Sequence, residues 1–440
     1  MPKPIKKQKA TIVMIRNYTL LFLLFLGIVP ALAKQRTRQE IQAIAQRLIA
    51  TSNDSHYAKV ASKDRDDSRG ELKEVAATAN YTVMAYDRGG FAIISNDDAN
   101  SPVIGYSQTS LFSIANPALA WYLNIANATL SNKDFYTIKT YTAGIPAGCK
   151  EKVDHLVETK WNQDDPYWDK CPEDGTGKHC YTGCVATAMA QIMRYYKYPT
   201  KGKGNASILY NGKSYEVNFA AGRGYDYDNM LATYNSTCTT TQKLAVATLM
   251  YHCGVAAKMT YGTNGSGAWL YDAADALYQH FGYTAKYYGY RDDLSDNLKN
   301  TVWREVIYQE LSDGHPILYA GTSNKNGNEK QSVHAFVLDG YDKDGNVGVN
   351  WGYGGGGDGY FSLDILSLKY GYDEEYKWWQ NMVIIHTPEA GPINNGLTGI
   401  EGITAPRPTD GKKYDLSGRE ITTPVKGTVY IENGKKHLCQ

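Results

Sequence analysis

The sequence has no excess of charge of either sign. Lys and Arg total 46 against 45 Asp and Glu among 440 residues, a formal net charge of +1. A nucleic-acid-binding domain normally carries a strong basic excess, so the composition excludes nucleic acid as an expected partner. The chain is also longer than a usual single domain of ~50–250 residues, and we expect two or three folded units.

Long apolar runs are almost absent. The one such run, Leu20–Ala33, follows a basic stretch and closes with Ala31-Leu32-Ala33, the order of a secretory signal cut after Ala33. It is shorter than the ~20 residues that cross a bilayer. We therefore expect residues 1–33 to be a signal peptide and the mature form to have no integral membrane span.

Cysteine is missing from the first 148 residues. All seven cysteines lie from Cys149 onwards, so thiol chemistry is confined to the later part of the chain. An odd number in a chain that enters an oxidising space leaves at least one thiol unpaired.

Two other uses of the cysteines stay open. Disulfides can join Cys171 to Cys180 or Cys238 to Cys253, and connectivity cannot be read from spacing. A zinc site is the second alternative, although the spacing matches no paired C-x-x-C pattern. Its ligands would be Cys171, His179, Cys180 and Cys184.

The rest of the chain divides into three parts: 34–148, 149–390 and 391–440. Periodicity in the first part predicts a small α+β domain. Its expected elements are a helix at Thr37–Ser52, two strands within Tyr81–Ser95 and a helix at Pro117–Leu130. The second part is rich in Tyr, Trp and Gly and holds the chemical candidates. The third follows a Gly-, Pro- and Asn-rich break and predicts short strands with tight turns.

Cys184 begins a predicted helix. Turn formers precede it, and good helix formers with an apolar face follow as far as the stop at Pro199. In the first turn, free N–H groups and the helix dipole favour an anion and lower the pKa of a thiol. A structural cysteine that caps a core helix is the alternative.

His334 stands at the start of a predicted apolar strand. Asp344-Gly345 predicts a hairpin turn that returns Asn350 and Trp351 towards His334. A thiol protease needs an imidazole to take the thiol proton and a third group to hold the ring. A core histidine is the alternative for His334 alone. Upstream of the cysteine, Gln163 supplies an amide that can join the backbone N–H of Cys184 as an oxyanion donor.

These segments together resemble the streptopain family of papain-like cysteine proteases. The resemblance rests on Trp161-Asn162-Gln163, Gly183-Cys184-Val185-Ala186-Thr187-Ala188, His334-Ala335-Phe336-Val337-Leu338-Asp339-Gly340 and Asn350-Trp351-Gly352. It implies an α+β fold: a papain-like two-lobed catalytic domain, with a helical lobe and an antiparallel β lobe. A small α+β propeptide domain precedes it and a short β-rich C-terminal segment follows.

The resemblance also implies the roles of the site residues. Cys184 is the nucleophile, His334 the general base and Gln163 the oxyanion donor, and either Asn350 or Trp351 stands beside the histidine. Substrate contacts are expected from Ser266, Val333 and Tyr353, where Tyr353 replaces a Trp that the family usually has. No cofactor and no metal are implied.

The first domain resembles the family's propeptide through Gly90-Phe91-Ala92-Ile93-Ile94-Ser95 and Pro102-Val103-Ile104-Gly105-Tyr106-Ser107. This implies a zymogen whose propeptide, 34–148, covers the cleft of a protease domain, 149–390, until a cut between about Gly144 and Thr159. The partners would be protein or peptide substrates and the chain's own propeptide.

The tail, 391–440, is similar to C-terminal sorting segments of secreted Bacteroidetes-type proteins, and an accessory β-module is the alternative. We therefore expect a protein that is secreted, at the cell surface or in the periplasm of a bacterium. A non-catalytic binding or inhibitor protein on the same scaffold is the alternative function, because fold alone does not establish activity.

Overall fold

The computed structural model describes most of the chain from residue 34 onwards. The described residues are 34–50, 69–131, 144–289, 296–325, 332–366, 376–393, 413–415, 420–423, 429–432 and 435–438. The expected signal peptide, residues 1–33, lies outside them. Within the described residues, no helix combines the length and apolar character needed to cross a membrane.

The N-terminal domain is a small antiparallel sheet with two helices. Helix α2 (Arg38–Ala50) starts with a capping box, in which Thr37 and Glu40 each bond the other's backbone N–H. The remaining elements are β1 (Leu72–Ala77), β2 (Tyr81–Tyr86), β3 (Phe91–Ser95), β4 (Val103–Ser107) and α3 (Pro117–Ser131). Both predicted helices and the predicted hairpin are confirmed.

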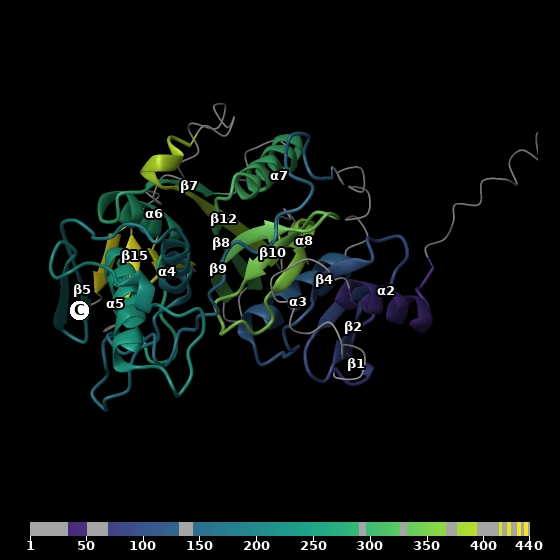
Figure 1. Ribbon diagram of the computed structural model, residues 1–440, viewed down its shortest axis with the longest axis horizontal. Coiled ribbons are helices and arrows are strands. Elements are labelled where there is room, and N and C mark those ends of the chain that lie inside the picture. Colours follow the sequence, from purple (N-terminus) through teal and green to yellow (C-terminus); the bar gives the residue numbers. More distant parts are fainter. Residues whose placement is uncertain are drawn as a thin grey trace, which may run out of the picture.

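One antiparallel sheet continues from this domain into the later part of the chain. Its later strands are β7 (Thr284–Gly289), β8 (Ile317–Lys325), β9 (Ser332–Tyr341), β10 (Asn346–Asn350), β11 (Gly359–Ser362) and β12 (Tyr376–His386). The ten strands run in the order β1-β2-β3-β4-β11-β10-β9-β8-β12-β7. The N-terminal domain is therefore attached by strand addition, with β4 paired to β11 (Figure 1).

The pairing of β4 with β11 requires a glycine. Gly105 lies opposite Phe361, and a Cβ on Gly105 would lie 2.4 Å from Cδ1 of that ring. Beside this pair, Tyr106 stacks on Tyr360 with ring centroids 5.5 Å apart, and its hydroxyl donates to Asp342 (2.9 Å). Backbone pairing and side-chain packing therefore act together at the junction.

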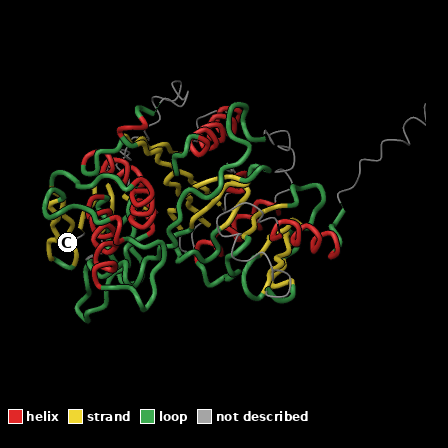
Figure 2. Tube along the Cα trace, in the orientation of Figure 1, coloured by secondary structure: helices red, strands yellow, loops and turns green. Residues whose placement is uncertain are grey.

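The central strands β8, β9 and β12 form a wall between two hydrophobic cores. Along β8, Leu318 and Ala320 join one core, whereas Ile317 and Tyr319 join the other, as the period of two dictates. Figures 1 and 2 show helices on one side of this wall. They are α4 (Cys184–Tyr196), α5 (Thr240–Ala256) and α6 (Leu270–Gln279). The other core contains α7 (Asp296–Ser312) together with α3 of the N-terminal domain.

This arrangement confirms the predicted α+β fold with a helical lobe and an antiparallel β lobe. The smaller elements are β5 (Asn205–Tyr210), β6 (Lys213–Asn218), η3 (Tyr227–Asn229), α8 (Leu363–Leu366) and η4 (Pro388–Ala390). The C-terminal segment forms a separate four-stranded sheet, as the turn-rich pattern predicted. Its strands are β13 (Lys413–Asp415), β14 (Glu420–Ile421), β15 (Val429–Glu432) and β16 (Lys435–Leu438). The boundaries at 148 and 390 stay predictions.

Candidate active site

Cys184 is the first residue of α4 and is half-buried. Gly183 before it has a φ of 86°, and a Cβ there would lie 2.7 Å from Sδ of Met259 and 3.0 Å from the Ser266 carbonyl. Both the backbone conformation and the space therefore favour glycine at this turn. The helix that follows is buried on all sides from Val185 to Met193, not on the single face that the sequence predicted.

The surroundings of Cys184 favour the protonated thiol in this conformation. Burial raises its pKa above the usual value, and this effect exceeds the opposing effect of backbone N–H groups, including those of Val185 and Ala335. The prediction of a lowered pKa from the helix N-terminus alone is therefore wrong for this state. A buried thiolate needs a nearby cation. No hydrogen bond or ion pair of the described residues joins Cys184 to the His334 ring.

His334 lies on β9 with its ring buried. Nε2 lies 2.8 Å from the Trp351 carbonyl oxygen. Because a carbonyl only accepts, Nε2 carries the hydrogen, and Nδ1 is left as the basic nitrogen of a neutral ring. Burial lowers the pKa of His334 to about 4, against the opposing effect of the bond to Trp351. The ring stacks beside Phe336, which lies on the same side of β9 (centroids 6.0 Å apart).

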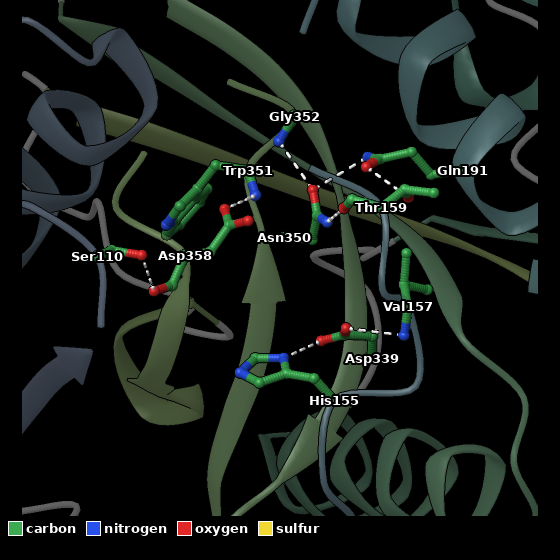
Figure 3. A network of polar contacts seen from close by, with 10 residues as sticks. All are labelled: Ser110, His155, Val157, Thr159, Gln191, Asp339, Asn350, Trp351, Gly352 and Asp358. Atoms are coloured by element: carbon green, nitrogen blue, oxygen red, sulfur yellow. Dashed lines mark hydrogen bonds and ion pairs between the residues drawn. The ribbon is translucent and has the colours of Figure 1, made fainter. Parts of the chain in front are cut away.

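Asn350 does not contact His334. Its side chain points towards Gln191 of α4 and Thr159 (Figure 3). Asn350 Nδ2 donates to the Thr159 carbonyl (2.6 Å), and its Oδ1 accepts from Gln191 Nε2 (3.0 Å) and from the Gly352 N–H (3.1 Å). In this conformation the backbone carbonyl of Trp351, and not the Asn350 side chain, is the group bonded to the imidazole. Which of the two residues orients His334 during catalysis stays a prediction.

The residues that hold Trp351 were not found from the sequence. Its N–H donates to Asp358 Oδ1 (2.8 Å) (Figure 3), and its indole N–H donates to the Gly357 carbonyl (3.1 Å). Gln191 and Thr159, which bond each other at 2.9 Å, hold the neighbouring Asn350. No sequence signal marked these residues, because an isolated Gln or Thr carries no pattern.

Gln163 and Tyr353 meet next to the cysteine. The Gln163 carbonyl accepts from the Thr182 N–H (3.0 Å), which ties Gln163 to the turn before α4. Its side chain lies close enough to the Tyr353 hydroxyl to oppose the increase in the pKa of that group. Burial raises the pKa of Tyr353 to about 12, and the negative charge of a Cys184 thiolate adds to that increase. The Tyr353 ring lies 5.1 Å from the His334 ring, so it lies among all three candidates.

The two other predicted substrate contacts flank these residues. The Ser266 carbonyl lies against Gly183, and its hydroxyl accepts from the Gly262 N–H (3.0 Å). Val333 directly precedes His334 and pairs with Thr322 of β8. Gln163, Cys184, Tyr353 and His334 thus converge from four segments, with Ser266 and Val333 beside them.

The N-terminal domain contacts the same region. Trp121 of α3 packs on Trp351 and Phe336, with ring centroids 6.4 and 6.1 Å away. It also lies against Gly321, which pairs with His334, where a Cβ would be 2.6 Å from its Cη2. The Trp121 indole therefore packs against the residues that surround His334.

The loop between β10 and β11 is held by the N-terminal domain as well. The Ser110 hydroxyl lies 2.9 Å from the carbonyls of Gly355 and Asp358, and the Asn116 amide donates to the Gly356 carbonyl. Because this loop carries Tyr353, the N-terminal domain restrains one side of the site.

The alternatives for the other cysteines are not supported. All six cysteines among the described residues are free thiols, so neither Cys171–Cys180 nor Cys238–Cys253 is a disulfide here. Cys171, His179, Cys180 and Cys184 do not form a ligand cluster within that part of the chain. His179 instead pairs with Glu173 (3.2 Å).

Comparisons with known proteins agree with this geometry. Residues 161–361 match the model of the Peptidase C10 family, and residues 33–129 match that of the Spi protease inhibitor. Streptopain of Streptococcus pyogenes serotype M28 is 32% identical over 343 residues, which cover 73% of this chain and 82% of streptopain. The thiol protease/hemagglutinin PrtT of Porphyromonas gingivalis is 28% identical over 89% of this chain and 46% of PrtT.

A solved structure is similar as well. A fragment of Prevotella intermedia prointerpain A, in which a cysteine is replaced by alanine, superposes with a TM-score of 0.61 at 35% identity, covering 71% of this chain and 97% of the fragment. Matches to a protease and to its inhibitor domain in one chain favour an enzyme precursor over a non-catalytic binding protein. The chain therefore belongs to the peptidase C10 family of cysteine endopeptidases and carries an inhibitory propeptide.

Proposed function

We propose that this endopeptidase uses Cys184 as nucleophile, His334 as general base and Gln163 as oxyanion donor, and that it is exported before it becomes active. The observation that carries the proposal is the convergence of Cys184, Gln163 and Tyr353 beside a histidine whose Nε2 is already held by the Trp351 carbonyl. Export rests on the signal-like sequence of residues 1–33 and places the protein outside the inner membrane of a bacterium, in the periplasm, at the cell surface or beyond.

The reaction follows from the free nitrogen of the imidazole. With Nε2–H bonded to Trp351, Nδ1 can take the Cys184 proton, and the thiolate attacks the peptide carbonyl. The Gln163 amide and the Cys184 N–H donate to the oxyanion that forms. The imidazolium then protonates the leaving amine, and water, activated by the same nitrogen, releases the acid from the acyl-enzyme.

The propeptide keeps these groups apart. His334 shares its side of β9 with Phe336, against which Trp121 of the propeptide packs, and no hydrogen bond or ion pair of the described residues joins His334 to Cys184 in this conformation. We propose that loss of Trp121 lets the loop that carries Trp351 and the His334 ring move together until Nδ1 meets the thiol.

The proposed maturation cut lies before Val153. From Val153 onwards the chain is bonded to β9, since Val153 and Tyr341 exchange both backbone hydrogen bonds at 2.8 Å. Ala147 and Gly148 are exposed, and a Cβ on Gly148 would meet nothing within 4 Å. A protease therefore has room near residues 144–152 but not in the later part of the predicted interval.

The trimmed enzyme is the protein from which the propeptide has been cut. Replacement of Gln163 by Ala should lower its kcat on the order of 10²-fold, because one oxyanion donor is lost. KM should change little, since the donor acts on charge that develops in the transition state. Steady-state kinetics on a fluorogenic peptide measure both parameters. Gln279→Ala, at an exposed glutamine of α6, is the matched control. An unchanged kcat in Gln163→Ala would place the donor elsewhere.

The stability of the precursor should fall as the pH falls through the range in which His334 titrates. The folded pKa of about 4 lies below the unfolded value of 6.5, so the unfolded chain takes up the proton first on acidification. The loss begins below pH 6.5 and is complete below pH 4. At ~1.4 kcal/mol per pKa unit it amounts to about 3 kcal/mol.

Urea unfolding of Cys184→Ala precursor at pH 7.5 and at pH 4.5 measures this loss. His252, whose pKa burial also lowers to about 4, contributes a similar loss, so His334 is isolated by adding His334→Gln to the Cys184→Ala background. The double variant should lose about 2 kcal/mol less between the two pH values. Equal losses in the two proteins would show that His334 is not buried as a neutral ring.

A further inference from the structure

We propose that Glu310, His315 and His386 form a binding site for a divalent transition-metal ion, Zn²⁺ being the ion that the donor set favours. Their ligand atoms all lie within 4.8 Å of one another, and no other such cluster of three occurs in the described residues. They come from three places: the last turns of α7, the turn between α7 and β8, and the end of β12. None of the three is a residue of the proposed peptidase reaction.

The donor distances suit one ion. Glu310 Oε2 and His386 Nε2 are 2.8 Å apart, and the rings of His386 and His315 have centroids separated by 4.2 Å. Donors bound at ~2.1 Å to one tetrahedral ion lie ~3.4 Å from each other. The Glu310–His386 distance is shorter than this value, and the largest distance among the ligand atoms is at most 4.8 Å. Shifts of about 1 Å therefore place all three ligand atoms around one ion.

The outer hydrogen bonds already orient both imidazoles as ligands. His386 Nδ1 faces the Gly391 carbonyl (3.3 Å), and His315 Nδ1 faces the Tyr196 hydroxyl (3.1 Å), whose own hydrogen goes to the Ile385 carbonyl (3.2 Å). His386 Nδ1 faces an acceptor and therefore donates, and His315 Nδ1 donates when the Tyr196 hydrogen goes to Ile385. In this tautomer Nε2 of each ring is the nitrogen that can bind a metal. A ligand histidine whose second nitrogen is fixed in this way is the usual arrangement in zinc sites.

A proton or a metal ion must lie between Glu310 and His386. With Nδ1–H of His386 given to Gly391, the Nε2 lone pair would face the Glu310 carboxylate at 2.8 Å unless a proton or a metal ion joins them. Both side chains are buried, whereas His315 is half-buried and leaves a path from solvent. Two imidazoles and one carboxylate, with a fourth position for water, are a set that binds Zn²⁺.

The position suggests a structural role. Tyr196, which holds His315, is the last residue of α4, whereas Cys184 is the first, and this helix of 13 residues spans ~18 Å. His386 ends β12, and its partner Gly391 follows directly on η4. A bound ion would thus join α7 to the strand that leads out of the catalytic domain towards residues 391–440.

Metal binding is tested on full-length Cys184→Ala protein, which cannot digest itself, after treatment with a chelator. We expect one Co²⁺ per chain with the visible absorption of a four- or five-coordinate nitrogen and oxygen site, displaced by Zn²⁺. Zn²⁺ should also raise the thermal unfolding midpoint. His315→Gln and Glu310→Gln should each remove the absorption and the shift, whereas His280→Gln, at a half-buried histidine elsewhere, should keep both.

Three outcomes would overturn the site. They are no Co²⁺ or Zn²⁺ bound at micromolar metal, binding that persists in both His315→Gln and Glu310→Gln, and thiolate-to-cobalt charge-transfer absorption, which would assign the metal to cysteines. Circular dichroism checks that each variant is folded. If Glu310→Gln unfolds, the half-buried His315→Gln decides.

Discussion

The trimmed enzyme should lose peptide hydrolysis by at least ~10⁴-fold when Cys184 is replaced by Ala, and by a similar factor when His334 is replaced by Ala. Loss of the nucleophile or the base of a catalytic unit costs up to ~10⁶ in kcat, and the residual rate comes from binding and the oxyanion donors. The double variant should be no less active than either single variant, because the two groups act as one unit.

Hydrolysis of a fluorogenic peptide by protein that begins near residue 149 measures these losses. Cys238→Ala is the matched control, since Cys238 is another partly exposed free thiol and bonds only within its own turn. Circular dichroism should show folded protein in every case. Substantial activity in Cys184→Ala, with thiol-free buffers and a mass-verified sample, would remove Cys184 from the role of nucleophile.

Full-length precursor should be at least ~100-fold less active than the trimmed enzyme. The N-terminal domain needs to favour the inactive conformation by only ~2.7 kcal/mol to produce this factor. The structure supplies several contacts for it: β4 extends the catalytic sheet, Trp121 packs beneath the site, and Ser110 bonds the loop that carries Tyr353. Initial rates before any processing, checked by gel, measure the ratio.

One substitution at the β4–β11 pair should weaken the attachment of the N-terminal domain to the catalytic domain. Gly105→Ala places a Cβ 2.4 Å from Phe361, so the pairing must open or the ring must move within the core. The precursor should then mature faster and show higher activity before processing. Gly175→Ala is the control, since a Cβ on Gly175 meets nothing within 4 Å. Equal rates for full-length and trimmed wild type would mean that the N-terminal domain does not inhibit.

The elements that carry local patterns could be predicted from the sequence. Helix α2 has a capping box and apolar residues at helical spacing, and the hairpin before Asn350 has an Asp-Gly turn. Cys184 and His334 could be proposed because each chemistry needs its residue type at a helix start or a strand. The pairing of β4 with β11 could not, because a non-local register leaves no periodic signal in either segment.

The electrostatic state of the site was also beyond the sequence. A helix N-terminus favours a thiolate, but in the precursor burial raises the pKa of Cys184, and no imidazolium among the causes of the shift offsets this effect. Likewise, the sequence pointed to the Asn350 side chain or to Trp351, and the group that holds His334 is a backbone carbonyl. Every residue has such a carbonyl, so only the fold shows which one matters.

The most direct test is mass-spectrometric mapping of the cysteine alkylated by an epoxide inhibitor of thiol proteases. We predict rapid labelling of Cys184 in the trimmed enzyme, slow labelling of Cys184 in the precursor, where its pKa is raised and His334 is held away, and loss of rapid labelling in trimmed His334→Ala. Labelling of Cys184 at the same rate in all three proteins, or labelling of another cysteine, would contradict the account.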